Sequence, residues 1–255
     1  MTLSDALGVT AGEVVALVGG GGKTTIMFRL AREAVERGGQ AITTTTTRIF
    51  GAQIALSPAH VPAAEATRER MAAELAAHGQ VLVIGETDTE SGKAEGVSVE
   101  LFAKLRAWFP SACLVNEADG SRMRPFKAPA RHEPVIPAET TLVVMVVGAD
   151  ILGKPLDAEH VHRPELVEKL SGAPLGSVIT PEVVARTLAH PEGGRKGVPP
   201  GARVVALINK VESLRDQAPA RETARLLLRE SAIHSVVLAA ARTNNPVLDV
   251  LSHPD

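Results

Sequence analysis

An apolar run, four consecutive glycines and a Lys-Thr-Thr triplet follow one another near the start of the chain. The stretch reads VVALVGGGGKTTIMFRL over residues 14–30. Glycine reaches positive φ angles and lets a backbone approach a ligand closely, so this order predicts a strand that turns sharply into a helix. Such a turn points backbone N–H groups at phosphate oxygens beside a helix N-terminus. We therefore expect the chain to be built around a strand, a phosphate loop and a helix.

The spacing of this loop is shorter than usual. The common pattern G-x-x-x-x-G-K-[ST] places its first glycine at Leu17, whereas G-x-x-G-K-T-T fits from Gly19. We expect Lys23 to contact the β and γ phosphates and the Thr24 hydroxyl to ligate Mg²⁺. The alternative is a glycine-rich turn with a solvated lysine. The expected nucleotide-binding residues of the loop are Gly19, Gly20, Gly21, Gly22, Lys23, Thr24 and Thr25.

Short apolar runs alternate with helix-like stretches along the rest of the chain. Strands are expected at residues 13–18, 40–44, 80–84, 112–116, 141–147, 203–208 and 235–239, and helices at 25–37, 62–78, 99–109, 162–170, 180–188 and 214–231. Continuous Val/Ile/Leu runs suit parallel strands that are covered on both faces. The pattern predicts an α/β fold: a doubly wound, mainly parallel sheet of the P-loop NTPase type, with helices on both faces. We expect one domain over residues 1–255, with a loop-rich substrate region at 119–200.

Composition narrows the possible partners. The net charge is −2 and aromatic residues make up 2% of the chain, without tyrosine, so no nucleic-acid partner is expected. The longest apolar runs are too short to span a bilayer, and the N-terminal residues do not resemble a signal peptide, so we expect a cytoplasmic protein without membrane contact. The single cysteine, Cys113, is expected to fill the core of a strand.

Two acidic residues follow the fourth expected strand, in ACLVNEADGS. A phosphate loop needs a carboxylate at the end of a neighbouring strand to hold the Mg²⁺ shell and to orient water. We expect Asp119 to hold Mg²⁺ together with Thr24, directly or through water, and Glu117 to position water. Lys23, Glu117 and Asp119 are thus the expected catalytic residues. An ordinary strand-end turn with exposed acids is the alternative.

Two further strand ends carry polar residues. AITTTTTRIF places Thr46, Thr47 and Arg48 at the carboxyl edge of the sheet, where ligands bind in parallel folds, although β-branched residues also simply favour strands. Residues 209–212 read Asn-Lys-Val-Glu, which resembles the Asn-Lys-x-Asp motif that reads guanine in GTPases. The glutamate is one methylene longer, so ATP and GTP both remain open. The expected base-binding residues are Asn209, Lys210 and Glu212.

The segment DGSRMRPFKAPARHEPVIP, residues 119–137, is dense in cationic residues and prolines. Its prolines forbid a long helix and favour a rigid loop at the edge of the sheet. A later loop, residues 148–165, adds more charged residues. Several cationic groups then converge near the γ phosphate, which favours an anionic second substrate. The expected substrate-binding residues are Arg48, Arg122, Lys127, His132, Glu133, His162 and Arg163.

The motifs together resemble a known family. VGGGGKTT, TTTTTR, EADGSRMRPFKAPARHEPVIP, VVGADILGKPL, VHRPE and LINKVE occur in the order found in the YqeC-type accessory proteins of selenium-dependent molybdenum hydroxylases, and they extend over nearly the whole chain. The resemblance implies a role in maturing or supplying the selenium-containing molybdenum cofactor. It also implies a molybdenum hydroxylase or a cofactor-biosynthesis protein as partner.

From the motifs and the resemblance we expect an Mg²⁺-dependent protein that binds ATP or GTP and hydrolyses it to assist cofactor maturation. Two alternatives stay open at this point. One is an ATP-dependent ligase or kinase that acts on a small anionic substrate. The other is a nucleotide-binding chaperone with little turnover.

Overall fold

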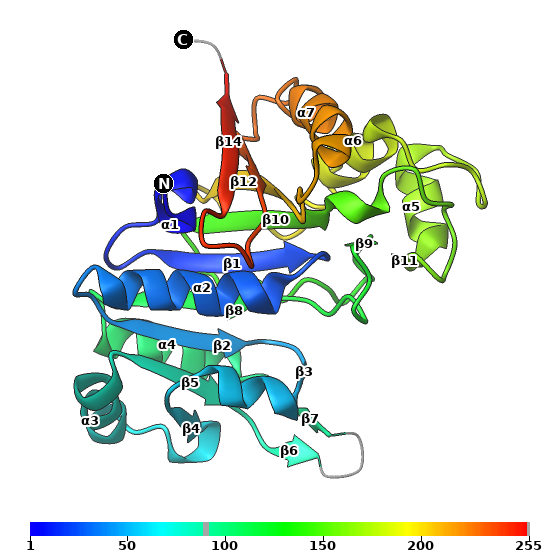
Figure 1. Ribbon diagram of the computed structural model, residues 1–255. Coiled ribbons are helices and arrows are strands. Elements are labelled where there is room, and N and C mark those ends of the chain that lie inside the picture. The colour runs from blue at the N-terminus through cyan, green and yellow to red at the C-terminus, as the bar shows by residue number, and fades with distance from the viewer. Residues whose placement is uncertain (89–91, 254–255) are drawn as a thin grey trace.

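The computed structural model describes residues 1–88 and 92–253, apart from the side chains of residues 49, 50 and 52. Within this part of the chain, a nine-stranded sheet forms the centre of the molecule (Figure 1). Its strands lie in the order β14 (Val247–Ser252), β13 (Ser235–Ala239), β12 (Arg203–Asn209), β10 (Leu142–Gly148), β1 (Val14–Gly19), β8 (Cys113–Glu117), β2 (Ala41–Thr45), β5 (Gln80–Ile84) and β4 (His60–Pro62).

The glycine loop leaves the sheet beside the acidic residues. β1 runs parallel to both of its neighbours, with Leu17 aligned to Glu117 on β8 and Gly19 aligned to Val146 on β10. Parallel strands end at the same edge of a sheet, so the loop after β1 and the acids after β8 meet there.

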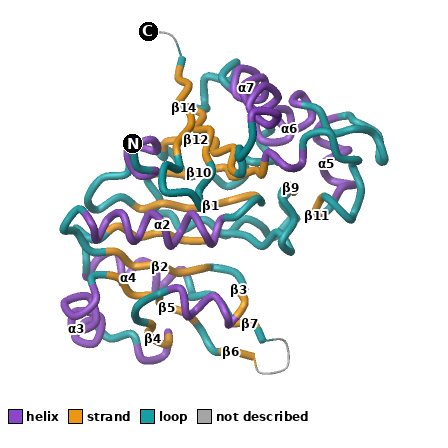
Figure 2. Tube along the Cα trace, in the orientation of Figure 1, coloured by secondary structure: helices purple, strands orange, loops and turns teal. Residues whose placement is uncertain are grey.

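Helices cover both faces of the sheet. Alternate side chains of β1 enter different cores: Val15 and Leu17 pack in the core that includes residues of α1 and α2, whereas Ala16 and Val18 pack in the core that includes residues of α6 and α7 (Figures 1 and 2). This arrangement confirms the expected doubly wound, mainly parallel α/β fold. The α-helices are α1 (Leu3–Leu7), α2 (Lys23–Glu36), α3 (Arg68–His78), α4 (Val99–Trp108), α5 (Pro164–Ser171), α6 (Pro181–Ala189) and α7 (Leu214–Leu227).

Several elements differ from the sequence-based expectation, and α1 is one of them, because no element was expected before residue 13. The helix expected from residue 62 begins only at Arg68, because Thr67 caps it, and residues 60–65 form β4 and the 3-10 turn η2 (Ala63–Glu65). The helix expected to reach residue 231 ends at Leu227. The antiparallel edge strand β14 was not expected, since one side of it is exposed and its sequence carries no continuous apolar run.

Two small sheets and two 3-10 turns complete the fold. β9 (Phe126–Lys127) pairs with β11 (Val161–His162), which brings the two loops expected to bind substrate side by side. β3 (Ile49–Phe50), β7 (Lys93–Ala94) and β6 (Thr87–Asp88) form the other sheet, and the turns are η1 (Gly51–Leu56) and η3 (Ala149–Ile151).

Two sequence-based expectations concern buried apolar segments. Cys113 is buried on β8, and that burial raises the pKa of its thiol to about 12, as suits a core residue. In the described part of the chain, every helix is too short or too polar to span a membrane.

Candidate phosphate-binding site

The four glycines are required by both backbone conformation and space. Gly19, Gly21 and Gly22 have φ angles of 97°, 82° and 111°. A Cβ on Gly21 would lie 2.2 Å from the Gly148 nitrogen, and one on Gly20 would lie 2.6 Å from the Arg124 oxygen. No other residue type fits this turn without moving the backbone around it.

The loop presents a set of backbone N–H groups at the start of α2. The Gly20 amide donates to the Val146 carbonyl at 2.9 Å, and the Gly21 amide donates more weakly to the Arg124 carbonyl at 3.3 Å. The next four amides have no acceptor among the described residues. They are the N–H groups of Gly22, Lys23, Thr24 and Thr25. Four free donors at a helix N-terminus form a nest for an anion.

Lys23 lies buried over this nest, with 3% of its surface exposed. Its ammonium donates to the Gly19 carbonyl at 2.6 Å and pairs with Asp119 at 3.2 Å and Glu117 at 3.5 Å. Burial disfavours the charged form, but the two carboxylates outweigh it and hold the pKa of Lys23 above its usual value. The lysine is therefore charged, and it is held next to the free amides.

The two acids after β8 have different partners. Glu117 accepts a hydrogen bond of 2.8 Å from the Thr24 hydroxyl. Both oxygens of Asp119 lie within 3.1 Å of the Gly19 amide, and they also face Lys23 and Lys127. Two oxygen groups therefore lie together at the start of α2, the Thr24 hydroxyl and the Glu117 carboxylate. The Asp119 carboxylate instead binds the glycine loop through the Gly19 amide.

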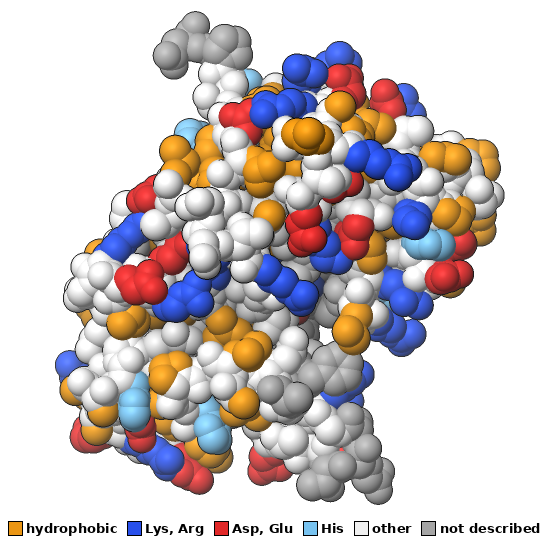
Figure 3. Space-filling model, viewed as in Figure 1, with side chains coloured by type: hydrophobic (Ala, Val, Ile, Leu, Met, Phe, Trp, Pro, Cys, Tyr) orange, Lys and Arg blue, Asp and Glu red, His pale blue; other side chains and the backbone are white. Residues whose placement is uncertain are grey.

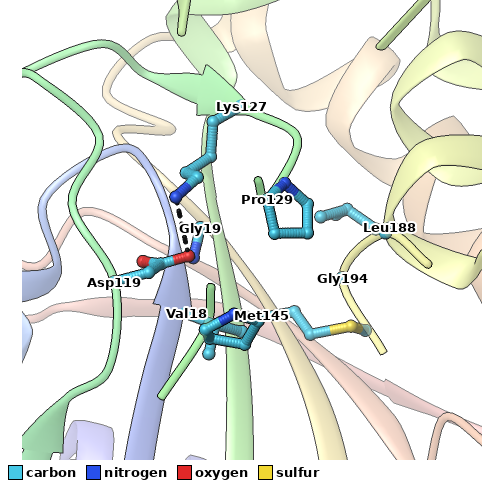
Figure 4. Close-up of a pocket in the computed structure, with 10 residues that line it drawn as sticks. Val18, Gly19, Asp119, Lys127, Pro129, Met145, Leu188 and Gly194 are labelled. Carbon is cyan, nitrogen blue, oxygen red and sulfur yellow. Dashed lines mark hydrogen bonds and ion pairs between the residues drawn. The ribbon is translucent and has the colours of Figure 1, made fainter. Parts of the chain in front are cut away.

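A chain of alternating charges continues from Asp119 into the loop-rich region. Lys127, which is 3% exposed, pairs with Asp119 at 3.1 Å and with Glu133 at 2.7 Å. Figure 4 shows the Lys127 ammonium reaching down to the Asp119 carboxylate beside Gly19. Arg163 also pairs with Glu133 at 2.7 Å. Burial would raise the pKa of Glu133, but the bonds from Arg163 and Lys127 lower it to about 2.

The other expected substrate residues lie around this charged end or on the surface. Burial and the nearby cations Arg163, Lys127 and Arg122 together lower the pKa of His162 to about 4, so its ring is neutral at pH 7. His132 is exposed, and Arg122 lies in a turn with a φ of 50°. Glu133 lies between Lys127 and Arg163, so the exposed Arg122 is the cation of this group that has no ion-pair partner among the described residues.

Asn209 joins the glycine loop to the loop after β13. Its side-chain amide donates to the Gly21 carbonyl at 2.7 Å, and its oxygen accepts from the Ala241 amide at 2.9 Å. The other two residues of the expected base-binding motif point elsewhere. Lys210 pairs with Asp150 at 2.7 Å, and Glu212 is exposed.

The threonine-rich stretch does not join the loop. Thr46 donates to the Val135 carbonyl, Thr47 bonds with Thr45, and Arg48 pairs with Glu95 at 3.1 Å on an exposed surface. The hydroxyls thus serve the sheet edge and the 119–137 loop, and the Arg48 guanidinium forms an ion pair outside the charged chain.

The sequence did not predict the backbone hydrogen bonds that hold the glycine loop against the end of β10 and against the 119–137 loop. The Val146 carbonyl and the Arg124 carbonyl accept from the loop amides, and the Gly148 amide donates to the Pro125 carbonyl at 2.9 Å. All of these are backbone groups, so residue type says little about them. Gly148 alone gave a signal, because a glycine that ends a buried strand often marks a close approach of two backbones.

A glycine loop between a central parallel strand and a helix, with lysine and threonine at the helix start and acids on the adjacent strand, defines a P-loop α/β protein. The chain belongs to the YqeC family, since the model of that family, described as "YqeC protein", matches residues 15–165. It is 30% identical over 198 residues to "Uncharacterized protein YqeC" of Escherichia coli (strain K12), which corresponds to 77% of this chain and 75% of that protein.

A solved structure, "Crystal structure of FlhF complexed with GTP/Mg(2+)", aligns with 98% of this chain and 76% of that one, at 12% sequence identity and a TM-score of 0.38. A TM-score and identity this low carry no conclusion about ligands.

Proposed function

We propose that this protein binds a nucleoside triphosphate with Mg²⁺ at the glycine loop and hydrolyses it. The observation that carries the proposal is the nest of four amides that have no acceptor among the described residues, together with the charged, buried Lys23 that begins α2. Donors fixed in this way recognise the β and γ phosphates and stabilise charge on a phosphoryl group during transfer.

The hydroxyl and carboxylate at the start of α2 fit Mg²⁺. The Thr24 hydroxyl and Glu117 are hard oxygen groups 2.8 Å apart, the donor type that Mg²⁺ prefers. Among the described residues no group of three or more His, Cys, Asp or Glu residues is placed to hold a metal ion. This fits Mg²⁺, which takes most of its ligands from phosphate and water. The ion would neutralise phosphate charge, and Glu117 is the residue placed to orient a water molecule.

Asp119 is the residue that we propose as the support of the nest rather than as a metal ligand. Its oxygens already face one amide and two ammonium groups. A Mg²⁺ ion would have to compete with all of these donors for the same lone pairs. Among the described residues, the Glu117 carboxylate has only Thr24 and the more distant Lys23 as partners.

In this proposal the nucleotide base lies against the ends of β12 and β13, which the Asn209 side chain connects. Asn209 fixes the glycine loop to the Ala241 segment, so the two sides of a base site are held at one spacing. Because Lys210 pairs with Asp150 and Glu212 is exposed, the motif alone does not choose between ATP and GTP. A competition measurement between ATP and GTP shows which nucleotide the site prefers.

Binding and turnover test this function. Isothermal titration of Mg²⁺·ATP and Mg²⁺·GTP is compared in wild type, Lys23→Met and Lys104→Met, the last being an exposed control on α4. Loss of a charge-assisted contact of roughly 1.5–3 kcal/mol predicts about 10- to 150-fold weaker binding for Lys23→Met. Wild-type affinity and turnover in that variant would sink the proposal.

A second measurement uses wild-type protein, so its result does not depend on whether a variant folds. In wild-type protein, Mg²⁺·nucleotide is expected to shift the backbone amide signals of Gly22, Lys23, Thr24 and Thr25. Saturating nucleotide that leaves all four signals unmoved contradicts the nest without any mutation. Thr24→Val, which keeps the shape of the side chain, is expected to weaken binding in Mg²⁺ much more than in EDTA.

A second candidate function, a ligase or kinase, is favoured by the cationic groups at the far end of the charge chain. Lys127, Arg163 and Arg122 all lower the pKa of His162. Glu133 pairs with the first two, and an anionic acceptor would bind near the exposed Arg122. Turnover that depends on a small anion and yields a new covalent product supports this function. Slow hydrolysis without an acceptor supports the hydrolase, and nucleotide binding without turnover supports a chaperone.

We propose that the biological role of this activity is maturation or insertion of the selenium-containing molybdenum cofactor. Support comes from the order and content of the motifs, above all the 119–137 loop joined to a short phosphate loop. Stimulation of nucleotide turnover by a selenium-dependent molybdenum hydroxylase is the expected result. An unchanged rate with saturating hydroxylase, in its cofactor-free and cofactor-loaded forms, argues against the role.

A further inference from the structure

A wide groove lies along the outer face of α2, which carries the phosphate nest at its N-terminus. The groove has a volume of about 660 Å³ and extends from Thr25 to Gln80, the first residue of β5. Small-molecule sites commonly measure about 300–1,000 Å³, so this groove has the size of a ligand site. Figure 3 shows basic and acidic side chains over α2 with hydrophobic ones beside them.

The charged side chains that line the groove all have the same sign. Three arginines and one histidine line it, without any aspartate or glutamate. Arg29 is already held by Glu33 at 2.8 Å and by the Ala241 carbonyl. Arg32 is 60% exposed and pairs with Glu36 at 3.5 Å, and Arg242 is exposed without an ion-pair partner among the described residues. Arg242 is therefore available to an anion, and Arg32 would have to leave only a weak surface pair to join it.

Gln80 adds an independent observation at the other end of the groove. It is 5% exposed, and its Nε2 atom has no hydrogen-bond partner among the described residues. A buried amide donor without an acceptor is unusual, because native proteins satisfy almost all such groups. A ligand oxygen in the groove would supply the missing acceptor.

The remaining walls are apolar. Phe28 and Val35 on α2 face the groove together with Leu56, which is 58% exposed. Apolar walls with a few polar groups are typical of small-molecule sites, in which the walls hold the body of the ligand and the polar groups fix its orientation.

We propose that this groove binds a small organic anion, a carboxylate or phosphate ester with a planar or aliphatic body, at a site separate from the phosphate nest. Arg32 and Arg242 pair with the anionic group, the apolar walls cover the body, and the Gln80 amide donates to a ligand oxygen. The groove adjoins the proposed nucleotide site, because Thr25 of the nest and Ala241 also line it, but its three binding residues belong to neither the nest nor the proposed base site.

Fluorescence titration with 8-anilinonaphthalene-1-sulfonate tests the groove, because this probe joins one fixed negative charge to a planar apolar body. N-phenyl-1-naphthylamine, the same body without the sulfonate, is the matched control. The variants are Arg32→Gln/Arg242→Gln and Gln80→Leu, with Arg68→Gln/Arg215→Gln as a control at exposed positions elsewhere. Circular dichroism melting reports the fold of each variant.

The sulfonate probe is expected to bind wild-type protein at one site. Its affinity for the Arg32→Gln/Arg242→Gln variant is expected to be lower by about tenfold or more, because each lost charge-assisted contact contributes a large part of the binding free energy of a small ligand. Gln80→Leu is expected to bind more weakly while melting at the same temperature or higher, because it removes an unpaired buried donor. A merely structural glutamine would lower the melting temperature. Phenylphosphate or phenylacetate, but not benzyl alcohol, is expected to displace the probe, and the better competitor identifies the anion.

Three results would overturn the proposal. The first is equal affinity for the charged and uncharged probes, and the second is an equal loss of affinity in the control arginine variant. The third is displacement of the probe by Mg²⁺·nucleotide in wild type but not in Lys23→Met, which would make the groove part of the nucleotide site. Retained probe binding in Lys23→Met, together with no nucleotide binding in any variant, refutes the nucleotide function and leaves the groove standing.

Discussion

Replacement of Lys127 by methionine tests the chain of buried charges most directly. Lys127 is 3% exposed, and its ammonium contacts Asp119 at 3.1 Å, Glu133 at 2.7 Å and the Gly120 carbonyl at 2.7 Å. Methionine keeps most of the side-chain volume and removes the charge. The two carboxylates then stay buried with one cation fewer between them.

The expected loss of stability follows from that geometry. Removal of one partner from a buried ion pair costs about 3–5 kcal/mol. Asp119 keeps Lys23, and Glu133 keeps Arg163, so neither carboxylate is left alone. We therefore expect the lower end, about 3 kcal/mol of unfolding free energy. For a chain of this size, roughly 2–4 °C per kcal/mol gives a fall in Tm of about 6–12 °C.

Urea unfolding followed by circular dichroism measures this loss, with Lys104→Met on the exposed side of α4 as the control. The double variant Lys127→Met/Glu133→Gln is expected to lose less than the sum of its single variants, because each removes the partner of the other. A loss below about 1 kcal/mol for Lys127→Met, the range of surface ion pairs, would refute the reasoning. So would strict additivity of the double variant.

Three other perturbations give separate outcomes. Gly21→Ala is expected to abolish nucleotide binding in a chain that still folds, since its Cβ would lie 2.2 Å from Gly148; calorimetry that finds wild-type affinity contradicts the close approach. Asn209→Ala is expected to weaken nucleotide binding by about tenfold, as it releases the glycine loop from the Ala241 segment; an unchanged dissociation constant contradicts this. His162 has a folded pKa of about 4, so the unfolded chain binds more protons and stability falls from pH 6.5 to pH 4; a pH slope in this window that His162→Gln leaves unchanged contradicts the assignment.

The pattern of apolar runs and glycines predicted the mainly parallel sheet and the helices on both of its faces, because both depend on local features. Continuous Val/Ile/Leu runs occur only where strands are covered on both faces, and the glycine loop needs no long-range partner to be recognised. β14 was not predicted because it is an edge strand whose sequence, VLDVLS, is interrupted by Asp249 and carries no continuous apolar run. The alanine-rich sequence suggested an earlier start for α3, but Thr67 caps the helix, which therefore begins at the next residue.

The partners of side chains in the site were harder to predict. The sequence places Glu117 and Asp119 two residues apart after one strand, and nothing local distinguishes them. The register of β1 against β8 does, because it sets Glu117 beside Leu17 and turns the Glu117 carboxylate toward α2. Asp119 comes after the strand end, where it meets the Gly19 amide.

That difference bears on how the loop would respond to a ligand. Without an anion, the Lys23 ammonium is shared among the Gly19 carbonyl and two carboxylates. A polyphosphate on the four free amides brings several negative charges close to Lys23, and the lysine then exchanges partners while Asp119 keeps Lys127 and the Gly19 amide. Because Lys127 stays in place, Asp119 does not become an unpaired buried charge when Lys23 turns to the phosphate. The second buried lysine is therefore expected to lower the cost of releasing the first when a polyphosphate binds.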